Sequence, residues 1–539
     1  MRFLVGIIAL LLILVLVGGG CMFVRMRGPF HSYELDVLLP ADPAAQAAAG
    51  PLEVGVAMHE VTPDMSKYDT WTDVNDNSKF DPDVDTYEDR NGNGRFDGVW
   101  LAGFGTNRPA KGIHDPLWAR AIAMRNNGVT VAMVTVDSIG LFHNTTIRIR
   151  KAVEATHDVD HVVVSATHNH EVPDTMKIWS FWKRIGGLDI PVFGFDEAYL
   201  AFLEERTAAA VKDAVDNLAP ANMYAATLDL PEKGFVRDSR KPHCIDNNVY
   251  LWRFTEPETD TTIATFVNWG NHPETLGSKN SLVTSDFVHY LREGVEKGVS
   301  DPNGAPGVGG MCLYFQGMVG GLMTQLGVAV PHRSGEEVFE ANSFEKAQAL
   351  GENVALAVNN ALRDPQLVWQ NENPYLAVGA RTMIAPAEGH YKWAIMLGLL
   401  HEGYYLGRGA KTEVNVLHIG DVRVLTVPGE VYPEIVKGPV EARPGRDFDI
   451  EPVEEPPLYD IMDGKQNLCI GLANDEIGYI LPKSQWDAEP PWTYGNDDQY
   501  GEGNSPGPDV GPALHATASK LIRDMEERYG TAENLVRAQ

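Results

Sequence analysis

The strongest constraint on the fold is a series of apolar runs that each end in polar residues. Residues 129–141 and 159–170 are nearly continuous runs rich in Val, and residues 261–274 and 416–430 repeat the pattern. Runs of this kind are typical of strands buried on both faces. Amphipathic helices are predicted between and after the strands, over residues 195–218, 344–362 and 513–530.

Strands that alternate with helices predict an α/β fold. We expect a single large domain over residues 52–539, with one mixed β-sheet and surrounding helices. The sequence shows no internal repeat and no low-complexity segment. Since open α/β sheets place their sites at strand ends, the polar residues after each apolar run predict a site at the strand tips.

The N-terminus carries a targeting signal. Residues 3–24 form a run of 22 residues without a charge, which as a helix is about 33 Å long and matches a hydrocarbon core. Three alternatives are open: an uncleaved signal anchor, a cleaved signal peptide, or a lipoprotein signal with Cys21 lipidated. Each predicts an extracytoplasmic protein, membrane-anchored or secreted. Residues 1–27 are assigned to this signal and residues 28–51 to a linker.

Charge and cysteine content exclude two classes of site. The formal net charge is −30 and no Lys/Arg-rich run is present, which argues against nucleic-acid binding. After Cys21, only Cys244, Cys312 and Cys469 remain, so at most one disulfide joins two of them. No Cys/His cluster is present, which excludes a thiolate zinc site. The sequence leaves the oligomeric state open.

Residues 73–97 form an acidic insertion with two similar loops. Residues 73–81 (DVNDNSKFD) and 89–97 (DRNGNGRFD) alternate oxygen side chains, with a small residue at the sixth position for the turn. Neither loop has the Glu that an EF-hand carries at position twelve. A solvated acidic loop is the alternative. We predict one or two structural calcium ions, with these ligands: Asp73, Asn75, Asn77, Asp81, Asp89, Asn91, Asn93 and Asp97.

A second constellation lies at the predicted strand tips. His168 and His170 follow one strand, His272 follows the next, and Glu430 follows a third. Alternate residues of an extended tip face the same side, so His168 and His170 can approach one ion. Nitrogen and oxygen ligands from separate strand ends suit a catalytic zinc with an open position. Each histidine alone is more often a structural hydrogen-bonding residue.

Several segments together resemble the neutral ceramidase family. The resemblance is carried, in the family's order, by residues 101–124 (LAGFGTNRPAKGIHDPLWARAIAM), 165–175 (SATHNHEVPDT), 266–287 (FVNWGNHPETLGSKNSLVTSDF), 427–434 (VPGEVYPE) and 471–482 (GLANDEIGYILP). It implies the neutral/alkaline, non-lysosomal ceramidase catalytic domain, without the family's C-terminal β-sandwich.

The resemblance also implies residue roles. It assigns one catalytic zinc to His168, His272, Glu430 and Tyr479. It gives His170 the task of polarising the scissile amide, with help from Tyr479, and it matches Arg237 to a substrate-anchoring arginine.

The chain departs from the family pattern at the catalytic serine. Where the family has G-D-x-S-P, residues 315–327 place Gly321 for Asp and Met323 for Ser. Glu171 and Asp174 are new carboxylates that could act as a base or hold a second metal; solvated loop residues are the alternative favoured at this stage. Glu171 is preferred as base because it adjoins His170, with Asp174 and Asp286 as further candidates.

The function expected is zinc-dependent hydrolysis of an N-acyl (amide) bond in a lipid or another amphiphile, through metal-activated water. The alternative is a catalytically degenerate, ceramidase-like protein of the cell envelope that binds a ligand or partner.

Overall fold

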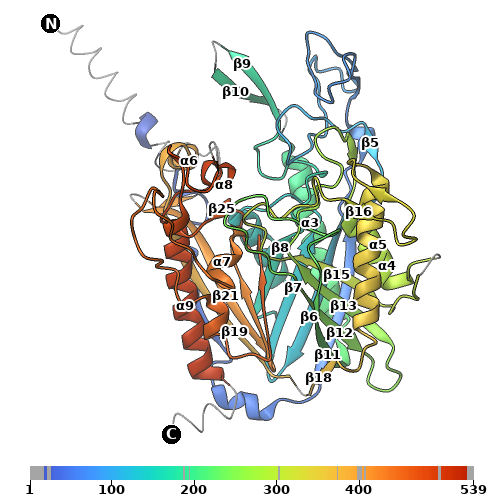
Figure 1. The fold of residues 1–539 in the computed structure, drawn as a ribbon, viewed down its shortest axis with the longest axis vertical. Coiled ribbons are helices and arrows are strands. Elements are labelled where there is room, and N and C mark those ends of the chain that lie inside the picture. The colour runs from blue at the N-terminus through green and yellow to red at the C-terminus, as the bar shows by residue number, and fades with distance from the viewer. Residues whose placement is uncertain are drawn as a thin grey trace, which may run out of the picture.

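Two large β-sheets pack face to face, and helices cover both outer faces (Figure 1). The computed structural model describes residues 17–20, 23, 26–185, 188–193, 195–300, 304–372, 374–396, 403–405, 408–495 and 499–530. The nearly all-apolar strands of the sequence follow from this arrangement: one face of each central strand meets the other sheet, and its second face meets helices.

The larger sheet has nine strands in the order β15-β13-β12-β11-β2-β6-β7-β8, with β18 paired to β11. Two of its pairs, β7 with β8 and β13 with β15, are parallel, and the others are antiparallel. Its strands are β2 (Leu52–Glu60), β6 (Trp118–Asn126), β7 (Val129–Val136), β8 (His161–Ala166), β11 (Ala219–Asp229), β12 (Asn248–Thr255), β13 (Thr262–Trp269), β15 (Met311–Gln316) and β18 (Trp369–Asn371).

The smaller sheet has six strands in the order β1-β19-β21-β22-β24, with β20 paired to β21. Only β22 and β24 run parallel. Its strands are β1 (Asp36–Leu39), β19 (Leu376–Ala385), β20 (Tyr404–Tyr405), β21 (Gly409–Ile419), β22 (Val422–Thr426) and β24 (Gln466–Ile470).

Helices bury their apolar faces on the outer sides of the two sheets. α2 and α3 cover β6 and β7, α4 and α5 cover β13 and β15, and α9 covers β19 and β21. The helices are α2 (His143–Glu154), α3 (Glu197–Asp216), α4 (Phe287–Lys297), α5 (Phe344–Ala361), α6 (Gly389–Met396), α7 (Pro433–Val436), α8 (Tyr500–Gly503) and α9 (Val510–Tyr529), with short 3₁₀ turns at Pro43–Ala48, Met65–Lys67, Leu458–Ile461 and Lys483–Gln485.

Five short ribbons join the loops around the strand tips. They pair β3 (Thr70–Thr72) with β4 (Thr86–Glu88), β5 (Gly112–Ile113) with β14 (Leu282–Val283), β9 (Phe181–Ile185) with β10 (Leu188–Phe193), β16 (Val330–Pro331) with β17 (Val338–Phe339), and β23 (Glu430–Val431) with β25 (Tyr479–Ile480). The β23–β25 ribbon matters most for function, because it carries two of the predicted metal ligands.

The single α/β domain is confirmed, and two details of the expectation need correction. The strands form two large sheets rather than one, because the second half of the chain builds its own sheet over the first. Part of the predicted linker over residues 28–51 is folded: β1 pairs with β19 from Asp36 to Leu39.

Two further expectations concern the N-terminal apolar run and the cysteines. The apolar run of residues 3–24 lies mostly outside the described residues. Within the part of the chain that is described, no helix is both long and apolar enough to span a bilayer. Cys244, Cys312 and Cys469 are all free thiols.

Candidate metal centre

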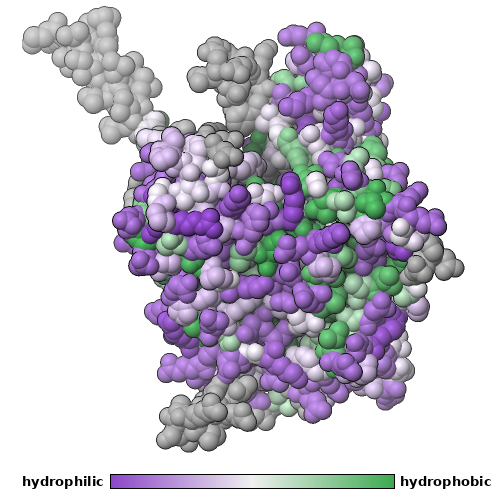
Figure 2. Space-filling model, in the orientation of Figure 1, coloured by the Kyte–Doolittle hydropathy of each residue, from purple (hydrophilic) through white to green (hydrophobic). Residues whose placement is uncertain are grey.

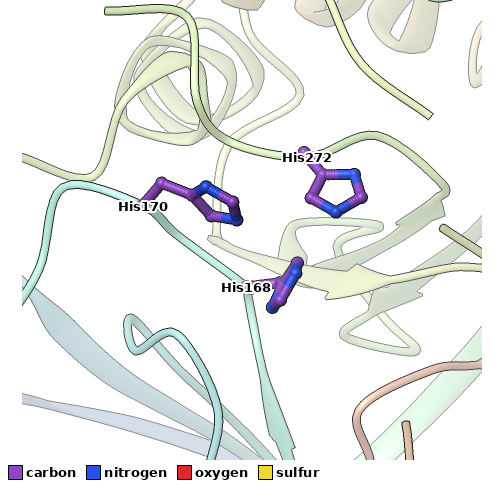
Figure 3. A group of neighbouring side chains, drawn as sticks. All are labelled: His168, His170 and His272. Atoms are coloured by element: carbon purple, nitrogen blue, oxygen red, sulfur yellow. The ribbon is translucent and has the colours of Figure 1, made fainter. Parts of the chain in front are cut away.

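Three histidines meet above the tips of the larger sheet. β8 ends at Ala166 and leads directly to His168 and His170, while β13 ends at Trp269 and leads to His272. Each ring offers a nitrogen within 4.8 Å of a nitrogen on the others, and Figure 3 shows the rings facing a common space. In the described part of the chain, this is the one group of three or more His, Cys, Asp or Glu side chains that converge in this way.

Two of the rings are held in a fixed orientation by backbone carbonyls. Nδ1 of His168 lies 2.6 Å from the carbonyl oxygen of Ile139, and Nδ1 of His272 lies 2.6 Å from that of Met323. A carbonyl can only accept, so both Nδ1 atoms carry the proton and both Nε2 atoms are free to coordinate. Such carbonyl contacts are the usual outer partners of metal-binding histidines.

The β23–β25 ribbon, which begins four residues after β22 of the smaller sheet, contributes a carboxylate to the same space. Oε2 of Glu430 lies 3.0 Å from Nε2 of His272 and 3.4 Å from Nε2 of His168. Burial by itself raises the pKa of the Glu430 carboxyl, but His168 and His272 outweigh burial and hold that pKa below its usual value. The carboxylate is therefore ionised, and two nitrogen donors and one oxygen donor converge.

Tyr479 lies beside Glu430 because β23 and β25 pair in parallel with these two residues in register. Its side chain is buried. Burial, and then the charge of Glu430, raise the pKa of the Tyr479 hydroxyl well above its ordinary value. The phenol is therefore neutral unless a cation is present, and Tyr479 lies next to Glu430 in the paired strands.

His170 faces a carboxylate that the sequence analysis missed. Oε2 of Glu274 lies 3.3 Å from Nδ1 of His170, and the hydroxyl of Thr324 donates to the other oxygen of Glu274. Burial, and then the charges of His168 and His272, lower the pKa of His170 well below its ordinary value, which favours the neutral imidazole. Glu274 stands two residues after His272, so the alternation rule applied to His168 and His170 would have found it.

A glycine lets the backbone approach His170 closely. Gly103 has a φ of 97°, and a Cβ at this position would lie 2.5 Å from the Cβ of His170. Phe104, the next residue, presents an aromatic ring 5.2 Å from the His170 ring, edge to face. The guanidinium of Arg108 lies over the other side of this phenylalanine. The segment around Gly103 thus forms one wall of the centre.

The new carboxylates after the histidines are buried, so the expectation of solvated loop residues is wrong for both. One oxygen of Glu171 accepts from Asn280 at 2.7 Å and pairs with Arg108 at 3.3 Å. Asp174 accepts backbone N–H groups of Met176 and Trp179 and closes a turn. The geometry gives Asp174 a structural role and brings Glu171 to Arg108, whereas the carboxylate facing His170 is Glu274.

The other base candidate, Asp286, has a structural task. It is the N-cap of α4, accepting from the backbone of Phe287, and Thr275 donates to the same oxygen. Burial raises its pKa to about 7. Arg237, the predicted substrate anchor, is exposed, and its backbone pairs with that of Thr324 beside the centre.

Position 323 serves the centre through its main chain. The carbonyl of Met323 accepts from both the backbone N–H and the Nδ1–H of His272. A side chain at position 321 would be strained, because Gly321 has a φ of 81°. A Cβ there would lie 3.1 Å from an oxygen of Asp238 and from Cε of Met323, so these side chains would have to shift. The loss of the family Asp and Ser therefore leaves the histidine side of the centre intact.

The two acidic loops project from the molecule beside this wall, and Figure 2 shows mostly hydrophilic residues over them at the top right. In the second loop, Asp89 accepts the backbone N–H groups of Gly92, Asn93 and Gly94, while the Asn91 and Asn93 amides donate to Asp97. In the first loop, Asp73 accepts from the Asn77 and Ser78 backbone and pairs with Lys111. Both loops are folded around their first aspartate.

The other predicted ligands of the first loop make fewer hydrogen bonds to the backbone or none. Asp81 accepts from the backbone of Asp83, and Asn77 accepts from that of Lys79. Asp85, which the loop pattern alone does not require, is buried and accepts from the backbone of Val74 and Asp81. Asn75 is exposed.

The residues at the strand tips fit a metal ion chemically. Burying the Glu430 carboxylate between two imidazoles costs free energy unless a cation compensates it. Both ring nitrogens of His170 are buried and neither makes a hydrogen bond, although Glu274 lies within ion-pair distance of Nδ1. Imidazole and carboxylate donors without thiolates suit zinc as well as copper, iron and nickel. His168, His272 and Glu430 can hold such an ion, with Tyr479 and His170 beside it.

Comparison with known proteins finds a family model that matches part of the chain. The model of the family "Neutral/alkaline non-lysosomal ceramidase, N-terminal" matches residues 92–324. The crystal structure of neutral ceramidase from Pseudomonas aeruginosa superposes with a TM-score of 0.61 and 14% identity, over 89% of this chain and 75% of that chain. A ceramidase complexed with C2 gives a TM-score of 0.59 at 14% identity, over 89% of this chain and 76% of that chain. Among curated proteins, no sequence matches.

The match confirms the resemblance inferred from the sequence. The matched range contains His168, His170, Glu274 and His272, while Glu430 and Tyr479 follow it in the chain. At 14% identity the superpositions show the fold alone, and they cover 89% of this chain, more than the range that the family model matches.

Proposed function

From the premise that residues 92–324 carry the N-terminal region of the neutral/alkaline ceramidase family, we propose that the chain is a zinc-dependent hydrolase of N-acyl bonds. Its substrate is a lipid or another amphiphile with an amide. The observation that carries the proposal is the convergence of His168 and His272, which follow strands of the larger sheet, with Glu430 of the β23–β25 ribbon, beside an imidazole that Glu274 faces.

Different residues would bind the metal ion and transfer the proton. His168, His272 and Glu430 would hold the ion, with Tyr479 as the fourth donor. Zinc supplies Lewis acidity, which polarises a carbonyl and makes water more acidic. With Glu274 at Nδ1, the neutral His170 ring keeps Nε2 as an acceptor, since the carboxylate favours the Nδ1–H tautomer.

This arrangement allows His170 to carry the proton. Nε2 of His170 takes a proton from water as the water oxygen attacks the amide carbon, and Glu274 stabilises the imidazolium that results. The same proton then passes to the leaving nitrogen as the C–N bond breaks, which yields a carboxylic acid and an amine. No serine takes part, so Met323 is compatible with turnover.

A test combines metal analysis with a panel of N-acyl substrates. The purified full chain should contain about one zinc per molecule and should release amine from at least one long-chain N-acyl compound. His272→Ala should lose both, while the matched control His243→Ala, an exposed histidine outside the centre, should keep both. If the wild type contains no zinc and His272→Ala hydrolyses amides equally well, the proposal fails.

One observation favours a second candidate, a ligand-binding protein without turnover. Gly321 and Met323 replace the family's Asp and Ser, and Met323 is buried. In that case the metal and the ligand would still bind. Tight binding of an N-acyl lipid by the zinc-loaded chain, with no amine released over hours, would decide for this candidate.

We also propose that residues 73–97 bind one or two calcium ions with a structural role. Support comes from the loop pattern and from the way each loop closes around Asp73 or Asp89. Calcium that binds only the folded state raises the melting temperature, so chelation should lower it. Asp89→Asn should abolish most of that shift, whereas Asp42→Asn, outside the insertion, should leave it intact. An unchanged melting temperature on chelation would refute the site.

A further inference from the structure

The entry of the chain into the fold lies beside the metal centre. Met26 is buried against Ala387, Ile395 and Ala410, and so packs on α6 and the adjoining strand β21. Figure 1 places α6, α8 and β25 together at the end from which the N-terminal segment leaves, opposite β18. The 22-residue apolar run ends at residue 24, two positions before Met26.

α6 and α8 form the rim next to the predicted metal ligands. The hydroxyl of Tyr391 in α6 donates to the carbonyl of Asn504 after α8, at 2.9 Å. The ring of Tyr500 in α8 lies 5.9 Å from that of Tyr479, edge to face. Tyr500 therefore adjoins the predicted ligand Tyr479 directly.

The outer side of this rim carries exposed aromatic rings. Trp393 of α6 is 58% exposed, Tyr500 is 57% exposed, and Tyr405 of β20 is 44% exposed. Tryptophan and tyrosine are the residues that favour the boundary between water and lipid, because each ring is apolar and carries one polar group. A face with three such rings exposes apolar area that a purely aqueous surface does not need.

Basic groups accompany these rings. Arg27, Lys392 and Arg408 are exposed on the same rim, with Glu388 as an exposed acid. Arg408 lies over the Tyr405 ring. In a chain with a net charge of −30, a local excess of positive groups is distinctive. Anionic headgroups attract such groups near the membrane surface.

We propose that the rim formed by α6, α8 and β20 lies on a lipid bilayer, with the metal centre opening toward that membrane. The occupant is the bilayer that receives the apolar run, because the first described residues after this run pack on α6. On this geometry an amphiphilic substrate reaches the centre from the membrane without crossing water. The route of the substrate from the membrane rests on the proposed function, whereas the docking of the rim on the bilayer does not.

Quenching of tryptophan fluorescence by brominated lipid tests the docking. The full chain is reconstituted into vesicles of phosphatidylcholine and phosphatidylglycerol, with and without dibrominated phosphatidylcholine. We expect quenching in the wild type and a clear loss of quenching in Trp393→Phe. The matched control, Trp369→Phe, changes a partly buried tryptophan of β18 at the opposite end and should leave quenching unchanged.

The outcomes separate the docking from the function. Equal quenching in the wild type and in Trp393→Phe would overturn the docking, as would loss of quenching in Trp369→Phe instead. For activity, Trp393→Glu should lower turnover of a bilayer-embedded N-acyl lipid about tenfold and leave a soluble short-chain substrate unchanged. If the wild type hydrolyses neither substrate, and Trp393→Phe still shows less quenching than the wild type, the proposed function is refuted and the docking stands.

Discussion

The two sheets contribute unequally to the metal centre. The larger sheet supplies His168 and His272, and each of these rings is already fixed by a carbonyl of its own sheet's loops. Glu430 comes from the short β23–β25 ribbon, which begins four residues after β22 of the smaller sheet, and its carboxylate meets those two rings. The two histidines are therefore preorganised by contacts within the larger sheet and its loops. The complete ligand set exists only when both sheets are packed together.

The largest effect is expected from the histidine half. His272→Ala removes a ligand and also the contact that ties β13 to the loop of Met323, so the metal and all measurable turnover should be lost. Glu430→Gln should retain part of the metal, because two fixed imidazoles remain. Metal analysis of both variants after the same dialysis checks the ranking. If His272→Ala retained metal and Glu430→Gln did not, Glu430 would contribute more to metal binding than His272, contrary to this ranking.

The next effect concerns the packing of the two sheets. Arg150 of α2 pairs through two nitrogens with Glu413 of β21, at 2.7 and 2.6 Å, and both side chains are buried. Breaking such a pair costs about 3–5 kcal/mol. Glu413→Gln should therefore lower the free energy of unfolding by about this amount at pH 7, as measured by urea denaturation.

The same pair gives a pH dependence with a defined sign. Burial raises the pKa of Glu413, but Arg150 outweighs burial and lowers it to about 2 from an ordinary value of 4.5. A lowered pKa in the folded state contributes stability above pH 4.5 that is lost as the pH falls toward 2. The gap in unfolding free energy between wild type and Glu413→Gln should narrow over this window. A constant gap would show that the ionised pair contributes nothing.

A smaller effect is expected at His170, which the proposed mechanism uses for proton transfer. His170→Ala should lower kcat by about 10²-fold or more, the usual contribution of a general acid–base group. Because the ligands His168, His272 and Glu430 remain, the variant should keep its zinc. Loss of zinc together with activity would instead make His170 a ligand, in keeping with its position in the three-histidine group.

The smallest effect is expected at Met323. Its carbonyl holds His272, and any side chain leaves that carbonyl in place. Met323→Leu conserves volume, so the cost in stability should stay below about 1.5 kcal/mol. We expect kcat within about threefold of wild type in a steady-state assay. A loss comparable to that of His170→Ala would show that the sulfur side chain itself takes part.

Local patterns in the sequence predicted much of the fold and the site. Val-rich runs predicted the buried strands β7 and β8, and the polar residues after them located His168 and His170. The second sheet could not be predicted, because the same buried-strand pattern results whether a helix or another sheet covers the strand. Glu274 was missed because the alternation rule was applied to His168 and His170 and not to the residue two positions after His272. Its significance comes from the approach of His170 across the fold.

The roles of Glu171 and Asp174 depended on long-range contacts as well. Both follow the histidine motif directly, which placed them near a metal in the sequence. Their functions are set by Arg108 and Asn280 for Glu171, and by the turn that Asp174 closes. Neither partnership is visible from spacing along the chain.

Anomalous diffraction at the zinc absorption edge tests the central claim most directly, namely that the larger sheet and the β23–β25 ribbon supply ligands to one metal ion. Crystals of the full chain should give a single strong zinc peak within coordinating distance of Nε2 of His168, Nε2 of His272 and the carboxylate of Glu430. A zinc peak held by the three histidines with Glu430 turned away would contradict this shared ligand set. The absence of any peak at the strand tips in zinc-loaded crystals would contradict the metal centre itself.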